Sequence, residues 1–380
     1  MGEVAREVTV GFVGLMADQY RGVGVPFLRS QNVRPHRIDL SDVKYIDHDF
    51  HGRLRKSALA PGDVVTVRTG KPGTSAVIPD WMHVANCSDL VVTRPGPYVD
   101  SRWLSYYLNF VIDSHIGGQL VGAVQQHFNV QSAKKLTLLL PDIAEQRAIS
   151  GVLGALDDKI VANERIIATA SDLMLRIVQS VGRFVPLSAL ARQTTTSVRP
   201  EQFDNIVAHF SLPAFDGGAQ PEVVNSQAIK SNKFMLSEPC VLFSKLNPRI
   251  PRIWDVGTLP EEMALASTEF VVLLPQALST SLVWAALSQA EVSDRLQQMV
   301  AGTSGSHQRI RPHELLSVEV RDVRALNPTS ASGVSQLGLV CSERRQESAG
   351  LVRARDELLP LLMSGKLRVK DAEAVASEVL

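Results

Sequence analysis

A heptad spacing of apolar residues between about Pro141 and Val181 constrains this chain more than any other feature. Intervals of four and three residues alternate along Ile149, Leu153, Leu156, Ile160, Asn163, Ile167, Ala170, Met174, Ile177 and Val181. Such spacing puts all of these side chains on one face of an α-helix. About 40 helical residues at ~1.5 Å each would reach about 60 Å, more than the width of a small domain. The pattern therefore predicts a helix that leaves the globular part and packs on an equally long partner.

A second helix is predicted at about 335–364, and it is the natural partner. Its more polar seam contains Leu337, Cys341, Ser348, Leu351, Leu358 and Leu362. Arg344 and Arg355 interrupt the seam, Pro360 should kink the helix and Gly365 should end it. We expect the two helices to pair antiparallel, so that each covers the apolar face of the other.

Asn163 is the polar exception in the first seam. An Asn among apolar seam residues commonly fixes the register or the partner of a helix, at some cost in stability. The alternative is a skewed seam in which Asn163 faces solvent.

The segments before the two helices resemble each other. Asp89 and Glu269, His127 and His307, and Leu136 and Leu316 are each 180 residues apart in similar surroundings. Each segment predicts short strands, then a helix (101–112 and 281–300), then a final strand (136–140 and 316–320). A duplication of an α+β domain, each copy ending in a long helix, explains this; chance similarity of two α/β domains is the alternative.

Composition narrows the class of protein. With 45% hydrophobic and 21% charged residues among 380, the chain has enough apolar side chains for more than one core. Cys87, Cys240 and Cys341 are too scattered for a disulfide framework, and no signal peptide or run of ~18 apolar residues is present. We therefore expect a soluble, cytoplasmic protein. Its net charge of zero means that any nucleic acid must be bound by a small oriented surface.

Signatures of catalysis are nearly absent from the sequence. It contains no GxxxxGK[ST], GxGxxG, HExxH or GxSxG motif. Asp142 and Glu145 resemble part of a metal-dependent nuclease site, but acidic residues at a helix start also favour the helix dipole. His48 and His51, beside Asp47 and Asp49, could bind a metal or form a solvated loop. We expect no catalytic residue, no metal site and no cofactor in this chain.

Basic and amide side chains gather in loops near glycine in both copies. Arg pairs with guanine edges, Asn and Gln with adenine edges, and Lys and Arg with phosphates. Solvated charged loops are the alternative, but their recurrence in both copies favours DNA contacts. The candidates in the first copy are Arg29, Asn32, Arg34, Arg53, Arg55, Lys56, Arg68, Lys71, Gln126 and His127, and those in the second are Lys230, Lys233, Lys245, Arg249, Arg252, His307, Arg309 and Arg311.

Two segments at the start of the first predicted helix form a recognisable pattern: Leu-Leu-Leu-Pro-Asp-Ile-Ala-Glu-Gln-Arg-Ala-Ile (138–149) and Leu-Gly-Ala-Leu-Asp-Asp-Lys-Ile-Val-Ala-Asn (153–163). They resemble the first conserved helix of the specificity subunits of type I restriction-modification systems. Residues 26–33, 61–65 and 68–73 resemble a target recognition domain, 185–191 the opening of the second such domain, and 355–367 the end of the second conserved helix. The first domain has no segment like 185–191.

The resemblance implies a non-catalytic subunit of four parts. Residues 1–140 and 185–325 would be target recognition domains, joined with pseudo-two-fold symmetry by a long helix at 141–184 and by a second helix with a C-terminal tail at 326–380. Each domain would read half of a bipartite site on double-stranded DNA while the helices fix the gap. Methyltransferase subunits would dock and methylate adenine, and motor-nuclease subunits would join them. S-adenosylmethionine, ATP and Mg²⁺ would act in those partners. A stand-alone DNA-binding regulator and a metal-dependent nuclease are the alternatives.

Overall fold

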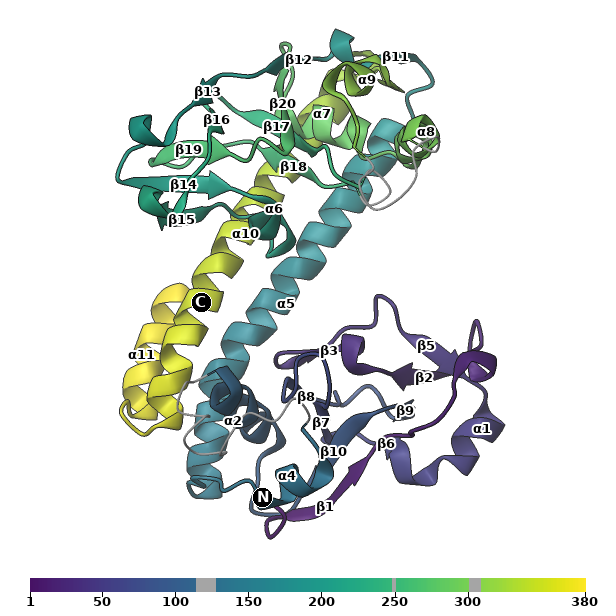
Figure 1. Ribbon diagram of the computed structural model, residues 1–380, viewed down its shortest axis with the longest axis vertical. Helices are drawn as coiled ribbons and strands as arrows, with labels where there is room; N and C mark the ends of the chain where they lie inside the picture. Colours follow the sequence, from purple (N-terminus) through teal and green to yellow (C-terminus); the bar gives the residue numbers. More distant parts are fainter. Residues whose placement is uncertain (114–127, 248–250, 301–308) are drawn as a thin grey trace. The chain divides into compact units, whose positions relative to one another are not determined.

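A computed structural model describes residues 1–113, 128–247, 251–300 and 309–380 (Figure 1). The chain divides into two compact units, Met1–Lys159 with Leu351–Leu380, and Ile160–Gly350. Both borders fall inside long helices, so each unit contains one α+β domain and a part of each long helix. Within the described residues, no helix has both the length and the apolar character that crossing a membrane requires.

The domain of the first unit is built on two small sheets. The central strand β7 (Val64–Val67) is mostly apolar, and each of its residues is buried. One sheet is antiparallel, in the order β1 (Ala5–Val10), β10 (Leu90–Pro95), β7 (Val64–Val67), β8 (Ser75–Val77). The other has the order β5 (Lys44–Ile46), β2 (Val25–Leu28), β9 (Ala85–Cys87), β6 (Ala58–Leu59), with β2 and β9 parallel.

The second domain repeats this connectivity. Its antiparallel sheet has the order β12 (Ala191–Thr194), β20 (Phe270–Pro275), β17 (Cys240–Ser244), β18 (Ile253–Val256). Its mixed sheet has the order β13 (Ser197–Val198), β16 (Lys233–Met235), β19 (Met263–Ala266), β14 (Ile206–Phe210), β15 (Glu222–Asn225), with β14 and β19 parallel. The predicted α+β fold with two similar domains is confirmed. The first domain adds a hairpin of β3 (Val33–Arg34) and β4 (Arg37–Ile38).

Helices connect and flank the sheets. The predicted helix at 101–112 is α2 (Ser101–Asp113). The predicted helix at 281–300 is two helices, α7 (Thr280–Leu287) and α8 (Ala290–Val300), and the buried Gln289 between them donates to the Ala285 and Leu175 carbonyls. The other helices are α1 (His48–Arg53), α4 (Val130–Lys135), α6 (Leu212–Asp216) and α9 (Pro312–Ser317), with 3₁₀ turns η1 (Ala17–Gln19), η2 (Ser30–Asn32), η3 (Arg55–Ser57), η4 (Leu187–Ala189), η5 (Pro200–Gln202), η6 (Ser226–Ala228) and η7 (Val323–Ala325).

Two long helices, α5 (Ile143–Gln179) and α10 (Pro328–Met363), follow the two domains as predicted. Inside the second unit the two helices run antiparallel, because Asn163 contacts Glu347 while the Ile167 carbonyl accepts from Cys341. In the first unit Asp157 of α5 pairs with Arg355 of α10 at 2.8 Å. Gly365, at φ +69°, follows the end of α10, and Pro360 lies within the helix.

Each long helix docks on the helix of its own domain in the same way. In the first unit the Ser150 hydroxyl donates to Asp100, which caps α2, and Gly154 lies against Arg102. In the second unit Ser335 lies 2.7 Å from Ser279, which caps α7, and Gly338 lies against Ser281. The duplication therefore extends to the joint between domain and long helix.

The predicted final strand at 136–140 does not form, and its predicted counterpart at 316–320 forms only in part, because 316–317 end helix α9 (Pro312–Ser317) and the strand spans 319–321. Phe184–Pro186 (β11) pairs with Glu319–Arg321 (β21) in the second domain. Within the described part of the first domain, residues 136–140 pair with no strand. Instead the amino group of Met1 donates to the Lys134 and Leu136 carbonyls, and the Gly2 amide donates to Lys134 at 2.9 Å. The predicted C-terminal tail contains helix α11 (Val369–Val379).

Candidate nucleic-acid interface

A basic residue and an acidic residue lie side by side at one end of the central strands of the first domain. Arg68 directly follows β7 and Asp89 directly precedes β10, and the antiparallel pairing of these strands brings the two side chains together. The Arg68 guanidinium forms an ion pair with the Asp89 carboxylate. The amide of Phe128 donates to the Arg68 carbonyl at 3.1 Å. The backbone after residue 127 is thus fixed beside this ion pair.

The second domain has the same arrangement. Lys245 directly follows β17 and Glu269 directly precedes β20, and the Lys245 amide donates to the Glu269 carbonyl at 2.8 Å. Here the ion pair is made by Arg309, at 3.1 Å from Glu269, while the amide of Ile310 donates to the Lys245 carbonyl at 3.0 Å. Burial lowers the pKa of Lys245, and the charge of Glu269 opposes that shift. Both domains therefore present a basic residue, a carboxylate and a returning backbone at one place.

The turn between β7 and β8 presents Lys71 to solvent. Gly70 and Gly73 have φ angles of +88° and +92°, which side chains rarely allow. The Gly73 amide donates to the Val67 carbonyl at 2.7 Å and closes the turn. The glycines of this predicted loop shape the backbone so that the Lys71 side chain is exposed.

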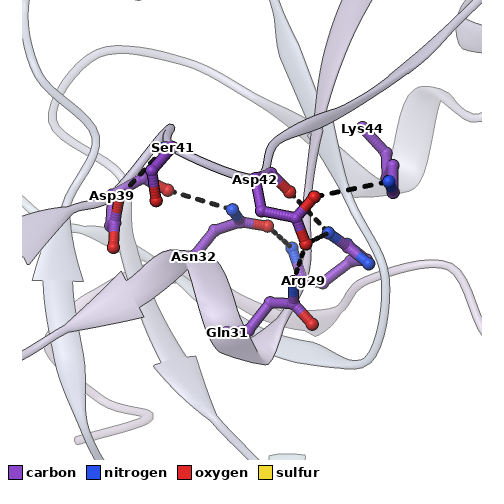
Figure 2. A network of polar contacts seen from close by, with 7 residues as sticks. All are labelled: Arg29, Gln31, Asn32, Asp39, Ser41, Asp42 and Lys44. Atoms are coloured by element: carbon purple, nitrogen blue, oxygen red, sulfur yellow. Dashed lines mark hydrogen bonds and ion pairs between the residues drawn. The ribbon is translucent and has the colours of Figure 1, made fainter. Parts of the chain in front are cut away.

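Asn32 is buried and holds a loop together. It is 1% exposed. Its side-chain oxygen Oδ1 accepts from the Arg29 amide at 3.0 Å, and its Nδ2 donates to the Asp39 carbonyl at 2.9 Å. The Arg29 guanidinium contacts Asp42 in the same network (Figure 2). These contacts give Asn32 a structural role in this loop.

Lys233 is a second candidate that the structure withdraws from the surface. It lies in β16 and is only 7% exposed, and its ammonium group donates to the hydroxyl and the carbonyl of Ser231. Burial lowers its pKa. Strand β16 has three residues, too few to show an alternating pattern from which the burial of Lys233 could be predicted.

Five of the predicted arginines form intramolecular ion pairs. Each contacts a carboxylate of its own domain, so its charge is partly neutralised before any ligand binds. The pairs are Arg29 with Asp42, Arg34 with Asp39, Arg68 with Asp89, Arg252 with Asp216, and Arg309 with Glu269.

Other predicted cations are exposed on loops and helix ends. Arg53 lies 5.2 Å from the Phe50 ring. The exposed set is Arg53, Arg55, Lys56, Lys71, Lys230 and Arg311. Gln126, His127, Arg249 and His307 lie outside the described residues.

A polar hollow of about 820 Å³ in the second domain adds residues that the sequence reasoning missed. Lys230 lines it together with Arg199, Gln202 and Asn232. In Arg199-Pro-Glu-Gln202 the arginine amide donates to the side-chain oxygen three residues later at 3.0 Å, as in Arg29-Ser-Gln-Asn32. That local similarity could have pointed to Arg199.

The acidic groups considered for metal binding have structural roles. Asp142 accepts from the Glu145 amide at 2.9 Å at the start of α5, and Asp47 caps α1 through the Phe50 amide. His51 lies 3.2 Å from the Asn86 amide group. In the described part of the chain no three His, Cys, Asp or Glu side chains form a group that could hold a metal ion.

No protein-family model and no curated protein matches this chain. Among solved structures, the type I restriction-modification system S subunit from M. genitalium aligns over 95% of this chain and 94% of its own, at 12% identity and a TM-score of 0.55. The chain has the fold of a type I restriction-modification S subunit. The HsdS subunit from Thermoanaerobacter tengcongensis aligns over 100% of this chain and 94% of its own, at 16% identity and a TM-score of 0.28. A structure of the type I R-M system aligns over 100% of this chain and 95% of its own, at 16% identity and a TM-score of 0.31. These two TM-scores are too low to support an argument.

In this S-subunit fold the heptad seam is the buried face of α5. Ile149, Leu153, Leu156, Ala170 and Met174 are all less than 10% exposed. In α10, Leu358 and Leu362 are buried too, while Ile167 and Ile177 pack partly exposed on the core of the second domain.

Asn163 is fully buried in that seam, which excludes the alternative that it faces solvent. Its Nδ2 donates to Glu347 at 2.9 Å and to Ser348 at 3.2 Å, and Arg344 pairs with Glu347 from the same helix. Its Oδ1 has no partner among the described residues. A polar cluster therefore lies inside the helix pair of the S-subunit fold.

Proposed function

We propose that this chain is the DNA sequence-recognition subunit of a type I restriction-modification system. Each domain reads one half of a bipartite, asymmetric site on double-stranded DNA. The observation that carries this proposal is a repeated position: Arg68 and Lys245 directly follow β7 and β17, which are equivalent strands in two domains with similar sheets. Two similar reading surfaces in one chain are what a two-part site requires.

The long helices fix the gap between the half-sites and dock methyltransferase subunits. The repeated joints, Ser150 with Asp100 and Ser335 with Ser279, support this role, because a spacer must be attached firmly to each reading domain. The chain itself is non-catalytic. S-adenosylmethionine is bound by the methyltransferase, and ATP and Mg²⁺ are used by motor-nuclease subunits. The complex acts in the cytoplasm against incoming phage DNA.

The affinity of the isolated chain for DNA should be weak and salt-sensitive. Lys and Arg contacts to phosphate set the salt dependence of binding, and many of the arginines here are already paired with carboxylates. Tight, specific binding should appear once methyltransferase subunits close around the duplex. Strong sequence-specific binding by the isolated chain at physiological salt would contradict this view.

Mapping of methyladenine in cells with and without the gene tests the proposal directly. Loss of methylation at one bipartite motif on deletion, and its return on complementation, would support it. Methylation that is identical at every motif in both strains would refute it.

Two simple controls test the alternative functions, a metal-dependent nuclease and a stand-alone DNA-binding regulator. A nuclease should cleave duplex DNA when the purified chain receives Mg²⁺, and Asp142→Asn should abolish that cleavage. A stand-alone regulator should purify from its host without a methyltransferase. We expect no cleavage, and we expect a methyltransferase to co-purify.

A further inference from the structure

The ion pairs at the repeated turns suggest how the chain avoids DNA of the wrong sequence. Arg68 and Arg309 are the cations in these pairs, and Asp89 and Glu269 are the carboxylates. A carboxylate beside a DNA-binding cation competes with phosphate for it and also repels the phosphate. Each domain thus has one arginine–carboxylate pair at this place, although the arginine in the second domain is Arg309 and not Lys245, the positional equivalent of Arg68.

The pairs are incompletely satisfied as internal contacts. The Nε of Arg68 and the Oε2 of Glu269 are buried and have no partner within the described residues. A buried polar atom without a partner destabilises the arrangement that contains it. A ligand that supplies the missing hydrogen-bond partners can therefore open this ion pair at a lower free-energy cost than an ion pair whose polar atoms are all satisfied.

Asp89 is also placed at a conformational cost. Its φ is +49°, a region that residues other than glycine rarely adopt, although Asn and Asp tolerate it best. The residue that precedes β10 is thus kept as a carboxylate in a backbone position that would suit glycine. Glu269, its counterpart before β20, is likewise acidic and contacts the local cation.

We infer that Asp89 and Glu269 are specificity-determining residues that lower the affinity of the two domains for non-cognate DNA. This inference rests on the proposed function. Without DNA each carboxylate holds its arginine; phosphate alone does not compensate for the exchange, whereas a base pair with suitably placed acceptors does. On this view, the acidic and basic charges that cancel over the whole chain also cancel locally at the two DNA-reading surfaces.

The test is the binding of the full chain to a labelled random-sequence duplex, followed by fluorescence anisotropy at several salt concentrations. Asp89→Asn and Asp89→Gly both suit a positive φ and remove the charge. Each should tighten binding about fivefold, the factor expected for one unit charge at ~4 Å in water, and should steepen the salt dependence. Glu269→Gln should act similarly through the second domain.

Glu7→Gln and Glu238→Gln are matched controls. Glu7 pairs with Arg94 near the far end of β10, and Glu238 pairs with Arg192 in the second domain, so each variant also removes a carboxylate from an ion pair. Neither should change the affinity. Equal tightening by the controls would reduce the effect to net charge and overturn the inference, as would unchanged or weaker binding by both Asp89 variants at an unchanged melting temperature.

Arg68→Ala and Lys71→Ala separate this inference from the proposed function. If they weaken binding while the Asp89 variants have no effect, the surface binds DNA and only the role of the carboxylates is wrong. If neither weakens binding, the surface does not bind DNA and the proposed function of these turns fails as well.

Discussion

Gly338 of α10 packs against Ser281 of α7 so closely that a Cβ on Gly338 would stand 1.9 Å from the Ser281 hydroxyl. Gly338→Ala should therefore destabilise the second unit by about 1–3 kcal/mol, because the helix must move away. Thermal melting, with hydrogen exchange of the α7 peptide, measures this.

Gly333 of the same helix has open space around it and is the matched control. Gly333→Ala should raise stability by about 0.5–1 kcal/mol through helix propensity alone. At Gly154 a Cβ would meet only the mobile end of Arg102, so Gly154→Ala should change little. A neutral Gly338→Ala would show that the joint in the second unit is loose.

Asn163→Leu should raise the free energy of unfolding by about 1 kcal/mol. The change removes a fully buried amide whose Oδ1 has no partner in the described parts of the chain, while Glu347 keeps its contact with Arg344. Urea titration monitored through α5 peptides would detect it. A loss of more than 1 kcal/mol would mean that the bonds of Asn163 to Glu347 and Ser348 hold the helix pair together.

His36 should make the first unit sensitive to acid. Burial is the main cause that lowers its pKa from 6.5 to about 4. Protonation is then easier in the unfolded state, so stability is complete above about pH 6.5 and falls towards pH 4, by about 3 kcal/mol in total. Hydrogen exchange of the β3–β4 hairpin, which His36 anchors through a 4.5 Å ring contact with Tyr106, reports this loss.

His36→Asn is the matched variant, because Asn tolerates the φ of +65° at this position and does not titrate. Its exchange rates should respond less to acid than those of the natural chain. The same response in both proteins would assign the acid sensitivity to another group.

Arg68→Ala should weaken DNA binding at one half-site only, by about 1–3 kcal/mol. Lys245→Ala, at the equivalent place in the second domain, should weaken the other half-site. Footprinting of the methyltransferase-bound complex on its own site distinguishes the two halves. Loss at both halves from either single change would contradict the division of labour between the domains.

The sequence predicted best what depends on a long local period. The seam from Ile149 to Met174 follows heptad spacing, so its buried face could be predicted without tertiary information. The failure at 136–140 has the opposite cause. A strand needs a partner: residues 319–321 pair with 184–186 in the second domain, whereas no strand among the described residues pairs with 136–140.

Prediction of single contacts was least successful. Asn32 and Lys233 are polar loop and strand-edge residues by sequence, yet both are buried, because η2 turns the Asn32 amide inward and Ser231 accepts from Lys233. Charge in a loop is visible in a sequence, but the carboxylate that neutralises it is not. Asp42 and Asp216 meet Arg29 and Arg252 only through the fold.

The internal ion pairs also change what a salt titration of this protein would count. When a phosphate displaces a carboxylate, condensed cations leave the DNA, but the released carboxylate attracts cations of its own. The slope of affinity against salt should therefore underestimate the number of phosphate contacts.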